Sequence, residues 1–386
     1  MNPRLAQISG SLIREIAAKR KPSSIDLGLG EPSLSPNPDH LHAGMRHALE
    51  RGLRYTLNAG DPVLREAIAK HYGYPEMSAA ENVCVTTGSQ EATYAVIKTM
   101  LDPAKDELLV VEPVFPSYGK MAALEGASVR TVTMSAQDDF AFDAARIAAA
   151  VNERTRMIVI CSPCNPTGRA ITQDQVSDLG ELLLRRGGEP VWILHDEIYR
   201  EQTYIENAGY VAANYPYTIV TNSVSKSNAL TGLRLGWAIA PAEIAAQIVK
   251  VHAWLTSCAD AFAQQVALHV FTTPGALREH AQWYAQRRET VVQILEQCGM
   301  RYIEPDGAFY ACVELPGGID SLAAAHELAD AYDVIAVPGV AFGREFGNWL
   351  RLTWVCEPQQ LREGLARIRA FTERRAGQAQ ASKPAS

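Results

Sequence analysis

Short apolar runs alternate with amphipathic segments through the middle of the chain. The runs are rich in β-branched and aliphatic residues, and the segments between them carry apolar residues at helical spacing. The seven runs occupy residues 83–87, 107–111, 128–133, 157–162, 191–196, 218–223 and 236–240. Because strands that alternate with helices form a mostly parallel sheet between two helical layers, the pattern predicts an α/β fold.

The two ends of the chain follow other patterns. Leu5, Ile8, Leu12 and Ile16 have the spacing of an amphipathic helix over residues 2–20. After a long helical region at 241–298, predicted strands (308–313, 349–355) mix with predicted helices (321–331, 358–371), which indicates a smaller α+β domain. We expect an N-terminal arm that forms part of the smaller domain (1–45), a large domain (46–285), the C-terminal smaller domain (286–375) and a flexible tail (376–386).

The composition narrows the classes of function. Of the 386 residues, 47% are apolar and 20% are charged, as in globular proteins. The net charge is -7 without a basic cluster, which argues against nucleic acid and anionic membranes as partners. No apolar run has the roughly 18 residues of a membrane span, and the charged first twenty residues do not read as a secretory signal.

The cysteines and histidines give no sign of a metal site. Seven cysteines, an odd number, indicate reduced thiols, so we expect a cytoplasmic protein. Cys161 and Cys164 form a CxxC without the second pair of a zinc site, and HExxH is missing. We therefore expect no metal, and buried thiols at both positions.

Polar residues stand directly after several predicted strands, at the edge where open α/β sheets bind ligands. Gly88, Ser89 and Gln90 open a helix, and the free amides and dipole of a helix start favour a phosphate, although capping is the commoner role of such a turn. Asn165 follows one strand and Asp196 ends the next. Taken singly, these would be a turn residue and a helix cap; together they indicate one ligand crevice.

A lysine at the next strand end completes this set. Ser223 and Ser225 precede Lys226, and Arg234 follows it eight residues later. Hydroxyls and a guanidinium together bind a phosphate, while burial and a nearby cation lower the pKa of a lysine. An isolated lysine would most simply be a solvated charge, but in this setting the free amine can attack a carbonyl. The pattern is that of a lysine that forms a Schiff base.

Taken together, these residues resemble the class I/II aminotransferases, a family of fold-type-I pyridoxal-phosphate enzymes. The resemblance extends from Gly28–Pro32 to Arg351, and its most specific motif is Ser225-Lys226-Ser227 followed by Gly232–Trp237. The earlier motifs are Asn165-Pro166-Thr167-Gly168 and Asp196-Glu197-Ile198-Tyr199. The resemblance implies transfer of an amino group between an α-amino acid and a 2-oxo acid, with pyridoxal 5'-phosphate as cofactor.

The resemblance also implies a role for each matching residue. Lys226 matches the lysine that bonds to the cofactor and moves the proton, and Asp196 matches the carboxylate that pairs with the pyridine nitrogen. Asn165 and Tyr199 match the donors to the ring hydroxyl, and Phe115 matches the aromatic residue stacked on the ring. The matching phosphate-site residues are Gly88, Ser89, Gln90, Ser223, Ser225 and Arg234.

Three further positions concern the substrate and the assembly. Arg351 matches the arginine that grips the substrate α-carboxylate, with Gly30 and Asn165 beside it. Tyr55 resembles the tyrosine that reaches the phosphate of a neighbouring subunit, which implies a homodimer with shared active sites. Gln90 stands where some aspartate-specific relatives have a lysine, and residues 227–230 lack the usual aromatic-Gly pair, which argues against an acidic substrate.

Other functions remain open from sequence alone. A carbon-sulfur β-lyase would use the same cofactor and the same lysine. A non-catalytic ligand sensor would need a DNA-binding domain, and only about 25 residues precede Gly28. A metal hydrolase has little support, because His326-Glu327 is followed by Asp330 where a second histidine would stand.

Overall fold

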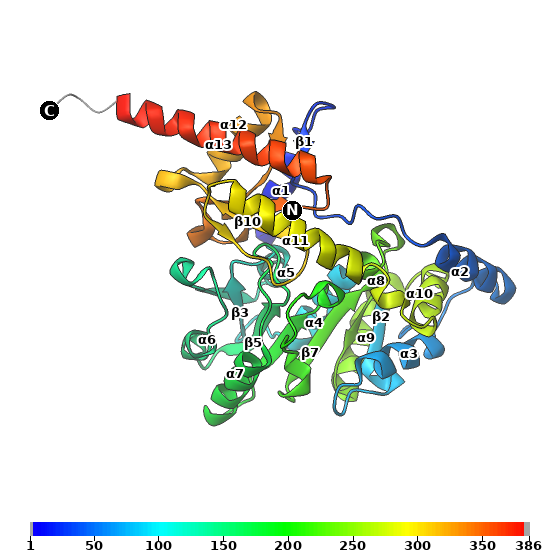
Figure 1. Cartoon of the computed structure of the whole chain (residues 1–386). Helices are drawn as coiled ribbons and strands as arrows, with labels where there is room; N and C mark the ends of the chain where they lie inside the picture. The colour runs from blue at the N-terminus through cyan, green and yellow to red at the C-terminus, as the bar shows by residue number, and fades with distance from the viewer. Residues whose placement is uncertain (1–2, 382–386) are drawn as a thin grey trace.

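The computed structural model describes residues 3–381, and a seven-stranded sheet lies at its centre (Figure 1). The strand order is β2-β8-β7-β6-β5-β3-β4, and β8 alone among them runs antiparallel to its neighbours. The strands are β2 (Val83–Thr86), β3 (Glu107–Glu112), β4 (Ser128–Thr133), β5 (Thr155–Cys161), β6 (Trp192–Asp196), β7 (Thr218–Ser223) and β8 (Gly236–Ile239). The predicted mostly parallel sheet is confirmed, with one strand from each predicted run.

Helices cover both faces of this sheet, because successive side chains of a buried strand point to opposite sides. The helices are α3 (Pro62–Tyr72), α4 (Ser89–Met100), α5 (Ser117–Glu125), α6 (Ala144–Ala150), α7 (Gln173–Arg185), α9 (Ala242–Thr256) and α10 (Ala261–Thr272). In β5, Met157 and Val159 share a core with α4, α5 and α9, whereas Ile158 and Ile160 pack with α6 and α7. Side chains of β2 and β8 pack with α3 and α10.

A second unit is built from both ends of the chain, as its colours in Figure 1 show. Its antiparallel sheet has the order β12-β13-β10-β9, and β1 pairs in parallel with β11. The strands are β1 (Ile25–Asp26), β9 (Tyr302–Ile303), β10 (Tyr310–Glu314), β11 (Val334–Ile335), β12 (Val337–Pro338) and β13 (Trp349–Thr353). The helices are α1 (Leu12–Ala17), α11 (Ala281–Gln297), α12 (Ser321–Ala331) and α13 (Pro358–Ala381).

The ends of the chain differ from the predictions in three places. The expected helix over 2–20 is a 3-10 turn at Pro3–Gln7 and then α1, because Ser11 caps a new helix start by accepting from the Arg14 amide. The long helical region is divided into α9, α10 and α11, with Asp260 capping α10. α13 continues through Ala381, and the remainder of the expected tail lies outside the described residues.

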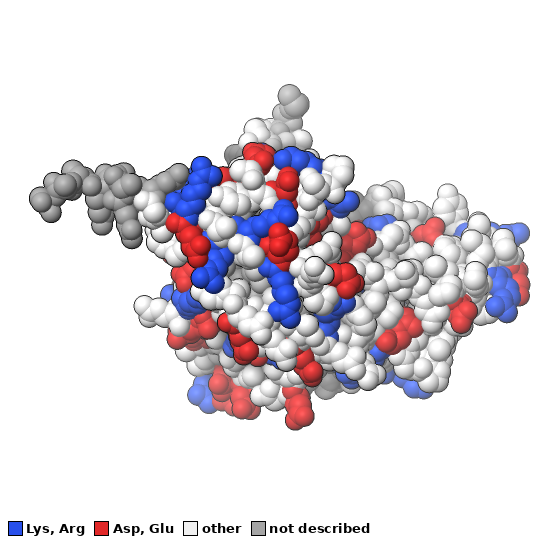
Figure 2. Space-filling view, turned by 45° about the horizontal axis from the view of Figure 1, so that its top comes forward, with Lys and Arg blue, Asp and Glu red and all other residues white. Residues whose placement is uncertain are grey.

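The domain division remains a prediction, although β1–β11 pairing joins the N-terminal arm to the C-terminal elements as that division requires. Its boundary at 285 falls inside α11. Figure 2 shows acidic and basic side chains interspersed over the visible face rather than gathered by sign. Within residues 3–381, no helix is long and apolar enough to cross a membrane.

Candidate active site

The carboxyl ends of β5, β6 and β7 lie side by side and bring three predicted residues to one edge. Cys161 pairs with Asp196 across β5 and β6, and Asp196 pairs with Thr221 across β6 and β7. Asn165 follows β5 by four residues, and Lys226 follows Thr221 by five. Since neighbouring parallel strands end at the same edge, an amide, a carboxylate and an amine converge there.

Lys226 lies on α8 (Val224–Ser227), a single turn that begins where β7 ends. Ser223 caps this turn by accepting from the Ser225 amide at 3.1 Å. The Lys226 Nζ donates to the Gly30 carbonyl oxygen at 2.7 Å. Burial lowers the pKa of Lys226 to about 8, with the nearby Arg351 and Arg234 acting in the same direction and Glu31 opposing them. The amine is therefore uncharged part of the time near neutral pH.

Asp196 is almost fully buried at the end of β6, and each of its oxygens accepts one hydrogen bond. The Tyr118 hydroxyl donates to Oδ2 at 2.7 Å, and the Ile198 amide donates to Oδ1 at 3.1 Å. Burial raises the pKa of Asp196 to about 6, and both hydrogen bonds oppose that rise. An ionised carboxylate at this position favours a cationic partner, because few donors compensate its lost hydration.

Aromatic side chains pack around these residues. The Tyr199 and Tyr310 hydroxyls lie 2.8 Å apart, and burial raises the pKa of Tyr199 well above its usual value. The half-buried Phe115 ring meets Tyr118 edge to face, with centroids 6.4 Å apart. Lys226 Nζ lies 5.8 Å from the centroid of the Phe309 ring. These rings form apolar walls that suit a flat aromatic ligand.

The predicted phosphate site is a tight cradle between α4 and the start of β8. Gly88 has φ 81° and carries the chain into α4, which begins at Ser89. A Cβ at Gly88 would lie 2.6 Å from Arg234 Nη2, and a Cβ at Gly236 would lie 2.3 Å from the Ser89 amide nitrogen. Glycine at positions 88 and 236 therefore lets the Arg234 guanidinium and the start of α4 lie close together. A helix start beside a cation is a favourable binding site for a phosphate.

If the cofactor implied by the sequence resemblance, pyridoxal phosphate, binds at this cradle, replacing Gly236 by alanine is expected to weaken its binding by at least tenfold, because the added methyl would displace the Ser89 amide. The measurement is a titration of the cofactor-free protein followed by cofactor absorbance. Gly232→Ala is the matched control, since a Cβ at Gly232 meets no atom within 4 Å. Equal affinity of both variants would contradict the assignment of this cradle.

Arg351 lies on β13 and is 2% exposed, so its charge is held by buried partners. Nη1 donates to Asn165 Oδ1 at 3.1 Å, and Nη2 donates to the Gly28 carbonyl oxygen. The guanidinium also faces the Tyr310 ring at 4.5 Å, while its Nε has no hydrogen-bond partner. A buried arginine whose Nε is unpaired has donor capacity left for a carboxylate, which a guanidinium can bind in bidentate fashion.

Some predicted residues lie away from this group. Tyr55 is 88% exposed and does not reach the site of its own chain. The Gln90 side chain is exposed, while its backbone follows Ser89 on the first turn of α4 beside the cradle. Cys161 and Cys164 carry free thiols, as do the other cysteines, and burial raises the pKa of both. Among the described residues, no group of three or more His, Cys, Asp or Glu side chains could hold a metal.

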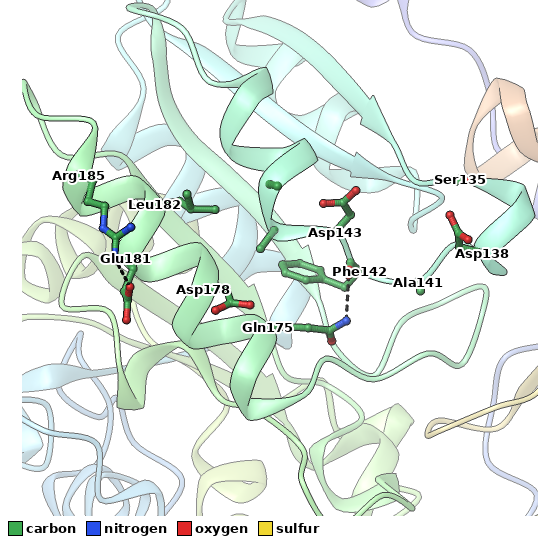
Figure 3. Close-up of a pocket in the computed structure, with 12 residues that line it drawn as sticks. Ser135, Asp138, Ala141, Phe142, Asp143, Gln175, Asp178, Glu181, Leu182 and Arg185 are labelled. Carbon is green, nitrogen blue, oxygen red and sulfur yellow. Dashed lines mark hydrogen bonds and ion pairs between the residues drawn. The ribbon is translucent and has the colours of Figure 1, made fainter.

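A separate cleft of about 550 Å³ lies between α6 and α7 (Figure 3). None of its lining residues belongs to the set at the sheet edge. Two of its four acidic side chains already serve the fold, because Asp143 caps α6 and Glu181 pairs with Arg185 at 2.7 Å. This cleft therefore does not compete with the sheet edge as the active site.

Sequence reasoning missed two buried tyrosines and a glutamine of the site. Tyr118 contacts Asp196, Tyr310 contacts Tyr199, and Gln202 Nε2 donates to the Lys226 carbonyl oxygen at 2.8 Å. Only Tyr118 had a sequence signal, since it lies three residues after the predicted ring-stacking Phe115.

Comparisons with known proteins place this arrangement in a family. The family model for aminotransferase class I and II matches residues 22–368. The aspartate aminotransferase of Pyrococcus horikoshii is 31% identical over 382 residues, covering 96% of each chain. A probable N-acetyl-LL-diaminopimelate aminotransferase of Bacillus subtilis is 32% identical, covering 96% of this chain and 95% of that protein.

Solved structures agree with the sequence relatives. The aspartate aminotransferase of Thermotoga maritima has a TM-score of 0.88 and 28% identity, covering 97% of this chain and 100% of its own. The aromatic aminotransferase of Pyrococcus horikoshii has a TM-score of 0.86 and 27% identity, covering 97% and 99%. The match of fold, coverage and motif order shows that the chain belongs to the class I and II aminotransferase family.

Proposed function

We propose that this aminotransferase holds pyridoxal 5'-phosphate at the edge formed by β5, β6 and β7, with Lys226 as the reactive amine. The observation that carries the proposal is the partly buried Lys226 amine, with a pKa lowered to about 8, at the same sheet edge as the buried Asp196 carboxylate. The glycine cradle at Gly88 and Gly236 supports a phosphate at the far end. Lys226 fits the aldehyde of the cofactor, Asp196 fits its ring nitrogen, and the glycine cradle fits its phosphate.

When bound, pyridoxal phosphate supplies an aldehyde for amines and a ring that withdraws electrons from the carbon being deprotonated. Lys226 Nζ provides the amine for that aldehyde, and when uncharged it can accept the substrate α-proton and return it elsewhere. Asp196 would keep the ring nitrogen protonated, and Asn165 and Tyr199 would donate to the ring hydroxyl. Phe115 would pack on the ring. Arg234, the first-turn amides of Ser89 and Gln90, and the hydroxyls of Ser223 and Ser225 would bind the phosphate.

Arg351 binds the substrate α-carboxylate in this proposal, beside Gly30 and Asn165. Arg351→Lys is expected to raise KM for the amino acid by about 10- to 100-fold, because a lysine cannot make the bidentate contact. Steady-state kinetics with cofactor in excess measure this change. Pyridoxal phosphate affinity should stay unchanged and serves as the internal control. If KM rises equally for substrate analogues that lack the α-carboxylate, Arg351 does not have this role.

The surface around Tyr55 supports a homodimer with shared active sites. Leu49, Leu53, Leu57 and Trp254 are 65%, 64%, 60% and 91% exposed, which is unusual for large apolar side chains. The Asn58 side chain donates to the Ser257 carbonyl oxygen at 2.6 Å, so the loop that carries Tyr55 lies against the end of α9. A second copy that covers this surface would bring its Tyr55 toward the phosphate cradle.

The substrates are an α-amino acid and a 2-oxo acid. The names of the relatives cover aspartate, prephenate, N-acetyl-LL-diaminopimelate and arginine with pyruvate, so they do not select a side chain. Gln90 in place of a lysine argues against an acidic side chain. A cytoplasmic location is part of this proposal, and the free cysteines support it.

Loading the protein with pyridoxal phosphate and adding single amino acids tests the proposed reaction. We expect pyridoxamine phosphate and the matching 2-oxo acid, and a subsequent 2-oxo acid should regenerate the starting form. Ammonia and pyruvate without pyridoxamine phosphate would instead identify a β-lyase. The relatives named above are aminotransferases, which favours the first outcome.

The lowered pKa of Lys226 predicts a pH dependence of stability without cofactor. Between about pH 8 and pH 10.5 the unfolded chain keeps a proton on this amine that the folded chain has lost. The free energy of unfolding should therefore rise with pH across this window, by on the order of 2 kcal/mol. Lys226→Met should remove that rise in denaturant titrations, and an unchanged slope would show that the amine is not destabilised by burial.

A further inference from the structure

The contact between Tyr118 and Asp196 joins two buried side chains from different elements. Tyr118 is 2% exposed on α5, and its hydroxyl donates to Asp196 Oδ2 at 2.7 Å. A hydrogen bond to an ionised carboxylate is about twice as strong as a neutral one. The other oxygen, Oδ1, accepts from the Ile198 amide, so each oxygen still has a lone pair for a further donor.

The segment that carries Tyr118 also carries the predicted ring-stacking residue. Phe115 precedes α5, and its ring packs edge to face against Tyr118 with centroids 6.4 Å apart. A short stretch of chain therefore carries both the side chain predicted to stack on the cofactor ring and the hydroxyl that donates to Asp196. This proximity indicates that Phe115 and Tyr118 serve the same ligand, rather than that the Tyr118 hydroxyl bonds to Asp196 only because it is buried.

We propose that Tyr118 is a positioning residue, which holds the Asp196 carboxylate ionised and in one orientation toward the pyridine nitrogen of the cofactor. The inference rests on the proposed function, because it assumes that pyridoxal phosphate binds at this sheet edge. Tyr118 acts through Asp196, since its hydroxyl is directed at that carboxylate.

Few other groups near Asp196 could hold its carboxylate ionised and in one orientation. His195 and Glu197 flank it in the chain, and their charges act on it in opposite directions. Cys161 lies across from it on β5, with a thiol whose pKa is raised by burial. β7 contributes Thr221 as its register partner, which does not titrate. Tyr118 is therefore the neutral side-chain donor that keeps Asp196 ionised.

Titration of cofactor-free protein with pyridoxal phosphate tests this role without an activity assay. Tyr118→Phe keeps the ring and is expected to weaken cofactor binding roughly tenfold at pH 7. The acid limb of the affinity against pH should move to higher pH, because the carboxylate loses a donor that favours its ionised form. Tyr215→Phe is the matched control: Tyr215 is also 2% exposed and donates to the Val191 carbonyl oxygen at 2.7 Å, at the opposite edge of the sheet.

A double-mutant cycle separates positioning from a structural effect. With Asp196→Asn in place, adding Tyr118→Phe should change cofactor affinity less than about twofold. An equal loss in both backgrounds, or a loss no larger than that of Tyr215→Phe, would overturn the inference. If either variant is less stable, the rise in Tm on adding cofactor is compared instead, because it depends on binding. Wild-type protein that fails to bind pyridoxal phosphate would overturn the proposed function itself.

Discussion

Replacing Lys226 by alanine is expected to abolish transamination, with kcat reduced by at least about 10⁴-fold. The amine has two tasks in the proposed reaction, to bond to the cofactor aldehyde and to move the substrate proton, and each alone contributes orders of magnitude. Alanine removes both. The loss should be visible in two measurements: product formation in a coupled assay, and covalent attachment of pyridoxal phosphate after borohydride reduction, detected by mass spectrometry.

A control lysine distinguishes this result from general damage. Lys250 on α9 is exposed and donates to Gln247 Oε1 at 2.8 Å, so Lys250→Ala should keep full activity and the covalent adduct. Lys226→Ala should also retain its Tm without cofactor, or gain, since it removes an amine that burial destabilises. A reduced adduct on another lysine with activity retained in Lys226→Ala would contradict the central assignment.

The strands of the large sheet could be predicted because their hydrophobic pattern is continuous and local. α2 (Pro38–Arg51) was not predicted, since its sequence mixes histidines and arginines with few apolar residues. It forms through a tertiary contact: a Cβ at Gly44 would lie 2.4 Å from a Val266 methyl carbon, which shows how closely α2 approaches α10. Such packing cannot be predicted from the local spacing of apolar residues.

The same distinction separates the site residues that could be predicted from those that could not. Asp196 ends a predicted strand, and Asn165 and Lys226 each follow one, so the topology alone places them at one edge. Tyr118 and Tyr310 reach that edge from 78 and 111 residues away from their partners, Asp196 and Tyr199. Their roles depend on how α5 and β10 pack on the sheet, and that packing follows from long-range contacts rather than motifs.

Replacing Asp196 by asparagine is the second change with a large expected effect. Asparagine keeps the shape and can still accept from Tyr118, but it carries no charge for the protonated ring nitrogen. We expect kcat/KM to fall by about 10² to 10³-fold, the range for loss of one preorganised electrostatic contact. Pyridoxal phosphate affinity should also fall, and its decline below about pH 6 should disappear, because that decline reports protonation of Asp196.

Asp196→Asn should also raise the stability of the cofactor-free protein while it weakens cofactor binding, and this combination makes the prediction specific. The folded chain holds a proton on Asp196 up to about pH 6, whereas an unfolded aspartate loses it near 3.8. Stability without cofactor therefore decreases as pH rises through this window, and above pH 6 the buried charge costs on the order of 2 kcal/mol. Asp196→Asn removes that cost, so at pH 7 the variant should unfold at a higher Tm while binding the cofactor more weakly. A variant that loses both stability and affinity would show that the carboxylate is structural, since only a charge kept for a ligand destabilises the empty site.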